Sequence, residues 1–191
     1  MTRRALGAAI AVLVGIGTWQ LGYGVWIHVK AHLAQHLLQR AWARTLAGER
    51  GVKPWPWADT WPVARLTAPA HGVDLIVLAG ASGRTLAFGP GHVDGSAVPG
   101  DAGTAIVTGH RDTHFAFLSR VRVGDVVVLD VPGHAPAVFR VSETAVVDAR
   151  TAAVGRDENG SALVLLTCYP FDAITAGGPL RYVVMAERAE S

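Results

Sequence analysis

The chain has 191 residues, of which half are apolar, 17% are charged and one is a cysteine. This composition excludes a disordered chain, and the lone cysteine excludes an intramolecular disulfide framework and a zinc site of clustered cysteines. The net charge of +2 argues against a nucleic-acid-binding protein, which usually carries a strong basic surplus. The charge is uneven, however. Residues 1–66 hold 8 Lys and Arg against 2 Asp and Glu, and residues 67–191 hold 9 against 13.

An uncharged apolar segment lies near the start of the chain. Residues 5–29 contain no formally charged side chain, and they lie between Arg3-Arg4 and Lys30. A helix of this length measures about 37 Å, more than the roughly 30 Å of a membrane's hydrocarbon core. The segment therefore predicts an uncleaved membrane anchor over residues 1–29. A cleaved signal peptide and a buried core helix are the alternatives, but the bulky residues after the run argue against signal cleavage.

Basic and aromatic residues indicate how this anchor is oriented. The basic pair before the apolar run predicts an N-terminus in the cytoplasm. Rings that suit the membrane interface gather near the other end of the run, at Trp19, Tyr23 and Trp26. We expect a single-pass protein of the cytoplasmic (inner) membrane that contacts lipid through this helix. Its remaining domain is expected on the periplasmic or extracellular side.

Residues 30–66 are expected to form a juxtamembrane helix and then a linker rich in proline and tryptophan. His28, His32 and His36 share one helix face, but no carboxylate or cysteine nearby completes a metal site, so a polar stripe is favoured. Three prolines within residues 53–62 forbid a regular helix there. An extended segment that packs against the chain's own domain is favoured over a binding site for a proline-reading module.

From residue 67 onward, short β-branched runs alternate with turn residues, a pattern typical of β-strands. Only residues 113–121 have a helical pattern. Short strands at this spacing predict an all-β domain over residues 67–191, either a sandwich or a barrel. Eight strands are expected, over residues 73–78, 85–88, 104–108, 126–131, 137–141, 144–147, 162–167 and 180–186.

Three reactive side chains lie at the ends of expected strands. Cys168 and His110 each follow an apolar strand, and Arg181 begins another. Cysteine attacks as a thiolate, which a neighbouring imidazolium or guanidinium stabilises. Arginine stays charged and can donate hydrogen bonds to a developing oxyanion. Such a set is chemically sufficient for acyl transfer from a peptide, although each residue alone is a weak signal.

The segments around these residues resemble the sortase family. The sequence LLTC at 165–168, followed by an arginine after twelve intervening residues, resembles the Thr-Cys strand end and arginine of sortases. The sequence TGHRD at 108–112 resembles the sortase histidine segment. The likeness covers about residues 72–188. The Pro-Trp-Pro-Trp segment and the single N-terminal anchor resemble most the class described from Gram-negative bacteria (class GN).

This resemblance implies an eight-stranded sortase-like β-barrel with one short helix, preceded by a transmembrane helix. It implies a cysteine transpeptidase that cleaves an LPxTG-like C-terminal sorting signal through a Cys thioacyl intermediate. The protein is then transferred to an amine acceptor. Carried over to this chain, Cys168 is the nucleophile, His110 the general acid and base, and Arg181 the oxyanion stabiliser. Thr167 and Thr108 are expected to contact the bound signal.

Neighbouring polar residues have open roles. Asp112 could orient His110, but it is favoured as the cap of a helix over residues 113–121. His114 is expected on the surface of that helix. Some sortases bind calcium, and Asp94, Asp101 and Asp172 could contribute to such a site, but isolated carboxylates in turns are normally only solvated. No cofactor is therefore expected.

Two other functions compete with transpeptidation. A thiol hydrolase would use the same residues with water as the acceptor, and the sequence does not separate it from a transpeptidase. A membrane-tethered β-barrel binding module without chemistry is the third hypothesis, against which the presence of Cys168, His110 and Arg181 argues. The sequence does not specify the sorting signal, the acceptor amine or the oligomeric state.

Overall fold

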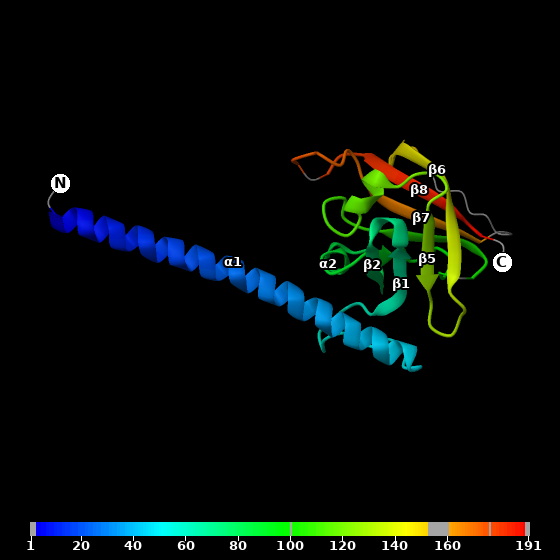
Figure 1. Cartoon of the computed structure of the whole chain (residues 1–191), viewed down its shortest axis with the longest axis horizontal. Coiled ribbons are helices and arrows are strands. Elements are labelled where there is room, and N and C mark those ends of the chain that lie inside the picture. Colours follow the sequence, from blue (N-terminus) through cyan, green and yellow to red (C-terminus); the bar gives the residue numbers. More distant parts are fainter. Residues whose placement is uncertain (1–2, 100, 153–160, 176, 190–191) are drawn as a thin grey trace. The chain divides into compact units, whose positions relative to one another are not determined.

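The structure is a computed structural model that describes residues 3–99, 101–152, 161–175 and 177–189. The chain forms two compact units, Met1–Leu37 and Leu38–Ser191. The first unit consists of most of the long helix α1 (Arg3–Leu46), and the second contains the last turns of α1 and all of the strands. Eight strands form a closed barrel, as the sequence predicts (Figure 1).

Helix α1 continues without a break through Lys30, where the sequence predicts the boundary between an anchor and a separate juxtamembrane helix. Within the described residues, Ile10–Leu46 is the one helix that is long and apolar enough to cross a membrane. Many large apolar side chains between Ile10 and Val29 are exposed; Leu13, Trp19 and Leu21 are 68–76% exposed. An exposed face of this kind needs an apolar partner, and a lipid bilayer is one such partner.

The last turns of α1 belong to the barrel unit. Leu38 and Trp42 are buried there, and they pack with Ile76 and Leu78 of strand β2 (Val73–Ala79) and with Phe88. The linker that follows contributes Trp55, whose ring meets Phe88 edge to face at a centroid distance of 4.8 Å. The expected packing of the Pro/Trp segment against its own domain therefore holds for Trp55. It does not hold for Trp57, which is 82% exposed.

The strands of the barrel follow the order β1-β2-β3-β4-β7-β8-β6-β5. The pairs β2/β3 and β4/β7 are parallel, and the other pairs are antiparallel. Three short helical elements, η1 (Pro69–His71), α2 (Gly83–Leu86) and η2 (Ala116–Arg120), connect strands. The strands are β1 (Pro62–Ala68), β2 (Val73–Ala79), β3 (Gly91–His92), β4 (Gly103–Thr108), β5 (Val126–Asp130), β6 (Ala137–Asp148), β7 (Ser161–Cys168) and β8 (Leu180–Arg188).

Alternate residues of the strands fill the barrel interior, because successive side chains of a strand point to opposite faces. On β7, Leu163, Leu165 and Thr167 are at most 1% exposed and point inward, so Cys168 lies on the outer face. Phe115 and Phe117, which follow β4, join the same core with ring centroids 5.9 Å apart. The rigid interior thus fixes which side chains reach the outer face at the strand ends.

Several expected strands differ from those in the structure. The barrel begins at Pro62, so residues 62–66 belong to β1 rather than to the linker that the sequence predicts. The expected strands over residues 137–141 and 144–147 are one strand, β6, with an irregular register between Val141 and Glu143. The two-residue strand β3 was not expected.

Two local predictions were wrong. Residues 85–88 were expected as a strand, but helix α2 lies there because the Ser82 hydroxyl accepts a hydrogen bond from the Thr85 backbone N–H and caps the turn. Residues 113–121 were expected as a helix capped by Asp112. The chain instead makes turns up to Phe115 and then the 3₁₀ helix η2, whose N-cap is Phe115 without a side-chain cap.

Candidate active site

Cys168 and Arg181 are direct partners across the antiparallel pair β7/β8. Residues directly opposite each other in a sheet project to the same face, with Cβ atoms about 5 Å apart. The Cys168 thiol is half-buried, and Arg181 is half-buried beside it on the outer face. The ladder between the two strands therefore holds a thiol and a permanent cation next to each other.

His110 reaches the same end of the barrel through strand β4. This strand runs parallel to β7, with Thr108 opposite Leu166, and His110 follows it two residues later. The Gly109 N–H donates to the Leu166 carbonyl at 3.2 Å, so the pairing continues into the turn that carries His110. The His110 side chain is exposed. The three residues that the sequence predicts as catalytic thus lie at the ends of the neighbouring strands β4, β7 and β8.

The two threonines expected to contact substrate lie on opposite faces. The Thr167 side chain points into the barrel, is 1% exposed and donates to the Gly109 carbonyl at 2.7 Å. It is therefore enclosed and not available to a ligand, and it fastens the His110 turn to β7 instead. Thr108 is half-buried on the outer face and donates to the Leu166 carbonyl at 3.0 Å.

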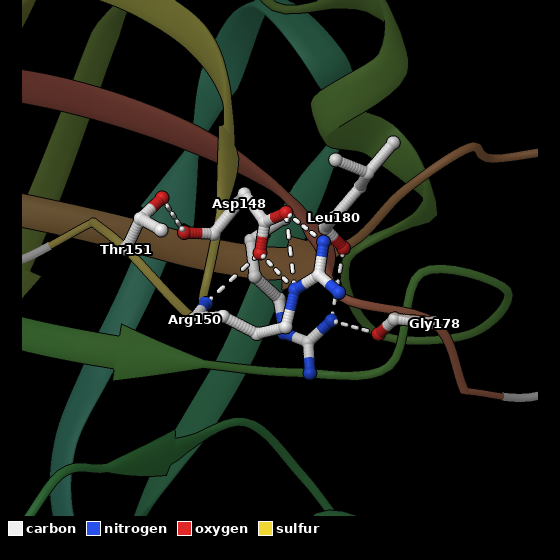
Figure 2. A network of polar contacts seen from close by, with 6 residues as sticks. Asp148, Arg150, Thr151, Gly178 and Leu180 are labelled. Carbon is white, nitrogen blue, oxygen red and sulfur yellow. Dashed lines mark hydrogen bonds and ion pairs between the residues drawn. The ribbon is translucent and has the colours of Figure 1, made fainter.

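Arg181 donates hydrogen bonds to two residues that Figure 2 labels, Gly178 and Leu180. Its Nη1 donates to the carbonyls of Gly178 and Leu180, at 2.8 and 2.9 Å. The carboxylate at the end of β6, Asp148, lies opposite Leu180 and is held by Arg150 at 2.6 Å. The hydrogen bonds from Arg150 lower the pKa of Asp148, so this carboxylate is charged and already partnered. Within the described residues, Arg181 has no carboxylate partner.

A groove of about 760 Å³ runs along the outer face of β6, β7 and β8. Arg181, the cross-strand partner of Cys168, is one of the residues that line it. Charged side chains, including Glu187 and Arg188, line it farther along β8. Its aliphatic floor is made of Ala145, Val147, Val164, Leu166, Val183 and Met185. Such a surface suits an extended peptide with apolar side chains better than a charged ligand.

Two residues next to His110 have places that the sequence did not predict. His114, expected on the surface, is half-buried. Its burial lowers its pKa, and the charge of His110 lowers that pKa further. Arg111 is only 8% exposed. The apolar residues in the sequence THFAF at 113–117 could have indicated that this turn packs inward. They do not indicate which of the neighbouring polar side chains become buried with it.

Asp112 has neither of the roles considered for it. It is exposed, and within the described residues its carboxylate has no hydrogen-bond partner, so nothing supports an orienting contact with His110. In the same part of the chain, no group of three or more His, Cys, Asp or Glu side chains comes together as metal ligands. Asp94, Asp101 and Asp172 therefore do not form a cluster among these residues.

Comparisons with known proteins agree with this geometry. The family model of the sortase domain matches residues 66–189. Sortase D of Bacillus subtilis (strain 168) is 28% identical over 124 residues, which are 64% of this chain and 62% of that protein. The chain thus matches less than two thirds of the length of this curated relative.

Solved structures of sortases have the same fold. Sortase C-1 of Actinomyces oris is 26% identical, with a TM-score of 0.60 over 68% of this chain and 75% of that one. Sortase A of Corynebacterium diphtheriae is 24% identical, with a TM-score of 0.63 over 83% of this chain and 85% of that one. Because the family model spans most of the chain and the predicted residues meet at one site, this protein belongs to the sortase family.

Proposed function

We propose that this protein is a membrane-anchored cysteine transpeptidase that cleaves an LPxTG-like C-terminal sorting signal. It would transfer the shortened protein to an amine acceptor. The observation that carries the proposal is the register of β7 and β8, which sets Cys168 directly opposite Arg181, at the end of the barrel where β4 delivers His110. The aliphatic groove that Arg181 lines supports an extended peptide substrate.

The first half-reaction forms a thioester. The Cys168 Sγ, as a thiolate, attacks the carbonyl carbon of the signal's threonine, and the carbonyl oxygen becomes negatively charged. Among the described residues, only the Nη1 of Arg181 is engaged, by two backbone carbonyls, so its other N–H groups can be donated to this oxygen. The C–N bond then breaks, and the protonated His110 gives its proton to the departing amine.

The second half-reaction releases the product. Neutral His110 accepts a proton from the incoming amine as that amine attacks the thioester carbonyl. The new amide bond forms, the C–S bond breaks, and the thiolate of Cys168 is regenerated. Water in place of the amine would give hydrolysis by the same steps. Hydrolysis is therefore the alternative function, and the acceptor decides between the two.

The membrane location and the subclass belong to the same proposal. The exposed apolar face of α1 supports a single-pass anchor in the cytoplasmic membrane, with the barrel on the periplasmic or extracellular side. The Pro/Trp segment and this anchor support an assignment to the Gram-negative class (class GN). No cofactor enters the proposed steps.

The proposal is tested by mass spectrometry of an acyl-enzyme trapped with a panel of sorting-signal peptides. We expect a thioester on Cys168 for the cognate peptide and amide products that depend on an added amine. Release of the free acid alone, at any amine concentration, would establish the hydrolase. A folded Cys168→Ala variant must lose turnover. Slow labelling of Cys168 by a thiol probe, unaffected by His110→Ala, together with no acyl-enzyme, would favour a binding module.

A further inference from the structure

Arg111 follows His110 directly and is buried, with 8% of its surface exposed. A guanidinium keeps its charge under all ordinary conditions, so its burial is unfavourable unless its N–H groups find good acceptors. Within the described residues no carboxylate pairs with it, and its Nη1 is buried without a hydrogen-bond partner. The side chain is therefore held in place by something other than an ion pair.

Two backbone carbonyls hold this side chain. The Arg111 Nη2 donates to the carbonyl of Ala173 at 2.8 Å and to that of Thr175 at 2.9 Å. Both acceptors lie in the segment of residues 169–179, which connects Cys168 to Arg181 and is called the β7–β8 loop below. Hydrogen bonds from a charged donor are about twice as strong as neutral ones. Arg111 thus fastens this loop to the turn that carries His110.

The β7–β8 loop is also attached at its ends, where Phe171 packs against the core and the Ala149 N–H donates to the Pro179 carbonyl at 2.8 Å. Among the described residues, its middle has few attachments besides Arg111. Ile174, between the two acceptors, is fully exposed, and the backbone of Gly177 and Gly178 is in the left-handed region, with φ of 100° and 88°. The far end of the loop holds the catalytic arginine, because the Gly178 carbonyl accepts the hydrogen bond from Arg181 Nη1. The same loop thus accepts hydrogen bonds from Arg111, beside His110, and from Arg181.

We propose that Arg111 is a positioning residue that sets the orientation of Arg181 through the β7–β8 loop. Arg111 thereby links the turn that carries His110, the proposed general acid and base, to Arg181, the proposed stabiliser of the oxyanion. The inference rests on the proposed transpeptidase function, since it assigns Arg111 a role in that reaction. Arg111 itself does not touch the substrate.

The tether is tested without reference to activity by hydrogen–deuterium exchange of the full-length protein. Arg111→Met removes both hydrogen bonds, and Arg111→Lys keeps the charge but replaces a planar fork with one ammonium group. Both variants are expected to raise exchange in peptides from residues 169–179, with β4 and β7 unchanged. Arg140→Met is the matched control, because Arg140 Nη1 also donates to a backbone carbonyl, that of Gly124, at 2.8 Å.

Kinetics with a cognate sorting-signal peptide test the positioning role. A displacement of about 1 Å in a catalytic group can cost about 10²-fold in rate. We expect Arg111→Lys to lower kcat by a factor of about 10 to 10², with KM changed much less. Alkylation of Cys168 by iodoacetamide should stay close to wild type, because β7 holds the thiol and alkylation forms no oxyanion. If Arg111→Met does not fold, Arg111→Lys carries both tests.

A double mutant shows whether Arg111 acts through Arg181. If it does, Arg111→Lys combined with Arg181→Lys lowers kcat/KM little more than Arg181→Lys alone. Fully multiplicative effects, or exchange in the loop that does not change, would overturn the proposal. A wild-type protein that forms no acyl-enzyme with any peptide would refute the proposed function instead, and the exchange experiment would still report on the tether.

Discussion

The hydroxyl of Thr167 donates a hydrogen bond to the carbonyl of Gly109 at 2.7 Å inside the barrel. Thr167 precedes Cys168 on β7, and Gly109 precedes His110 after β4. One buried contact therefore joins the backbone beside the thiol to the backbone beside the imidazole. The residue was expected to contact substrate, but its side chain lies on the inner face, where it fastens the turn that carries His110 to the strand that carries Cys168.

Thr167→Val tests this attachment with a side chain of nearly the same shape. The variant leaves the buried Gly109 carbonyl without its partner, which costs about 1–3 kcal/mol in the free energy of unfolding. We also expect a fall in kcat, because the His110 turn loses its attachment to β7. Urea denaturation and peptide turnover measure the two effects. Ser119→Ala is the control, because the hydrogen bond from the Ser119 hydroxyl to the Ala116 carbonyl is exposed. This variant should change neither the free energy of unfolding nor kcat.

Gly109 is required by the close approach of an aromatic ring. A Cβ at this position would lie 2.9 Å from the Phe115 ring, and Phe115 is fully buried in the barrel core. Gly109→Ala therefore forces either the ring or the His110 turn to move, with a destabilisation of about 1–3 kcal/mol. The melting temperature and the peptide turnover of this variant are both expected to fall. Gly133→Ala and Gly95→Ala are less suitable controls because both have positive φ, so Gly83→Ala, in open space, is the matched one.

A normal melting temperature and normal turnover for Gly109→Ala would contradict the close packing of Phe115 beneath the His110 turn. Reduced turnover with normal stability would mean that the turn, rather than the ring, moves. The protein would then accommodate the added methyl group by displacing His110.

The sequence predicted those parts of the site that have a recognisable local pattern of residues. Cys168, His110 and Arg181 end or begin apolar strands, and this local pattern, together with the resemblance of the surrounding segments to sortases, predicted these residues and the barrel. Thr167 was expected to contact the bound signal because the resemblance to sortases implies this of the threonine before the cysteine. The alternation of β7 decides otherwise, since Leu163, Leu165 and Thr167 share the inner face.

Other features leave no local signal. The partners of Arg111 are backbone carbonyls of Ala173 and Thr175, which any sequence provides, so only the tertiary structure reveals the tether. Helix α2 was taken for a strand because Thr85 and Phe88 favour β structure, whereas the Ser82 cap was given no weight. Strand β1 was missed because it begins at Pro62, directly after a segment that proline and tryptophan dominate.

His114 is expected to make the protein less stable in mild acid. Burial lowers its pKa in the folded state, and the charge of His110 lowers it further. As the pH falls through about 6.5, the ordinary pKa of histidine, the unfolded chain takes up the proton before the folded protein does. The stability present above that pH is therefore lost as the pH falls towards the folded-state pKa of His114.

His114→Gln should remove this part of the pH dependence. Unfolding free energies measured in urea at pH 8 and pH 5.5 should differ less for the variant than for the wild type. His134→Gln, which changes an exposed histidine, is the control and should keep the wild-type dependence. An equal loss of stability in all three proteins would show that other groups cause the acid sensitivity.

Arg181→Lys is expected to be much worse than its conserved charge suggests. The guanidinium uses Nη1 to bind the carbonyls of Gly178 and Leu180, which leaves its other N–H groups for the oxyanion. A lysine ammonium is a point charge without this fork, so it cannot hold the loop and direct donors to the substrate at once. Loss of one oxyanion donor costs about 10² to 10³ in rate in well-studied hydrolases.

We therefore expect kcat/KM of Arg181→Lys to fall by about 10² to 10³, while alkylation of Cys168 changes little because it creates no carbonyl oxyanion. Arg150→Lys is the matched control, since Arg150 binds Asp148 at the same end of the barrel and its side chain is 73% exposed. Its turnover should stay close to wild type, because exposed ion pairs contribute only about 0–1 kcal/mol. Near-normal turnover of Arg181→Lys with a small drop in melting temperature would show that Arg181 serves the strand and not the reaction. An unchanged melting temperature with turnover lost would instead place its guanidinium at the oxyanion.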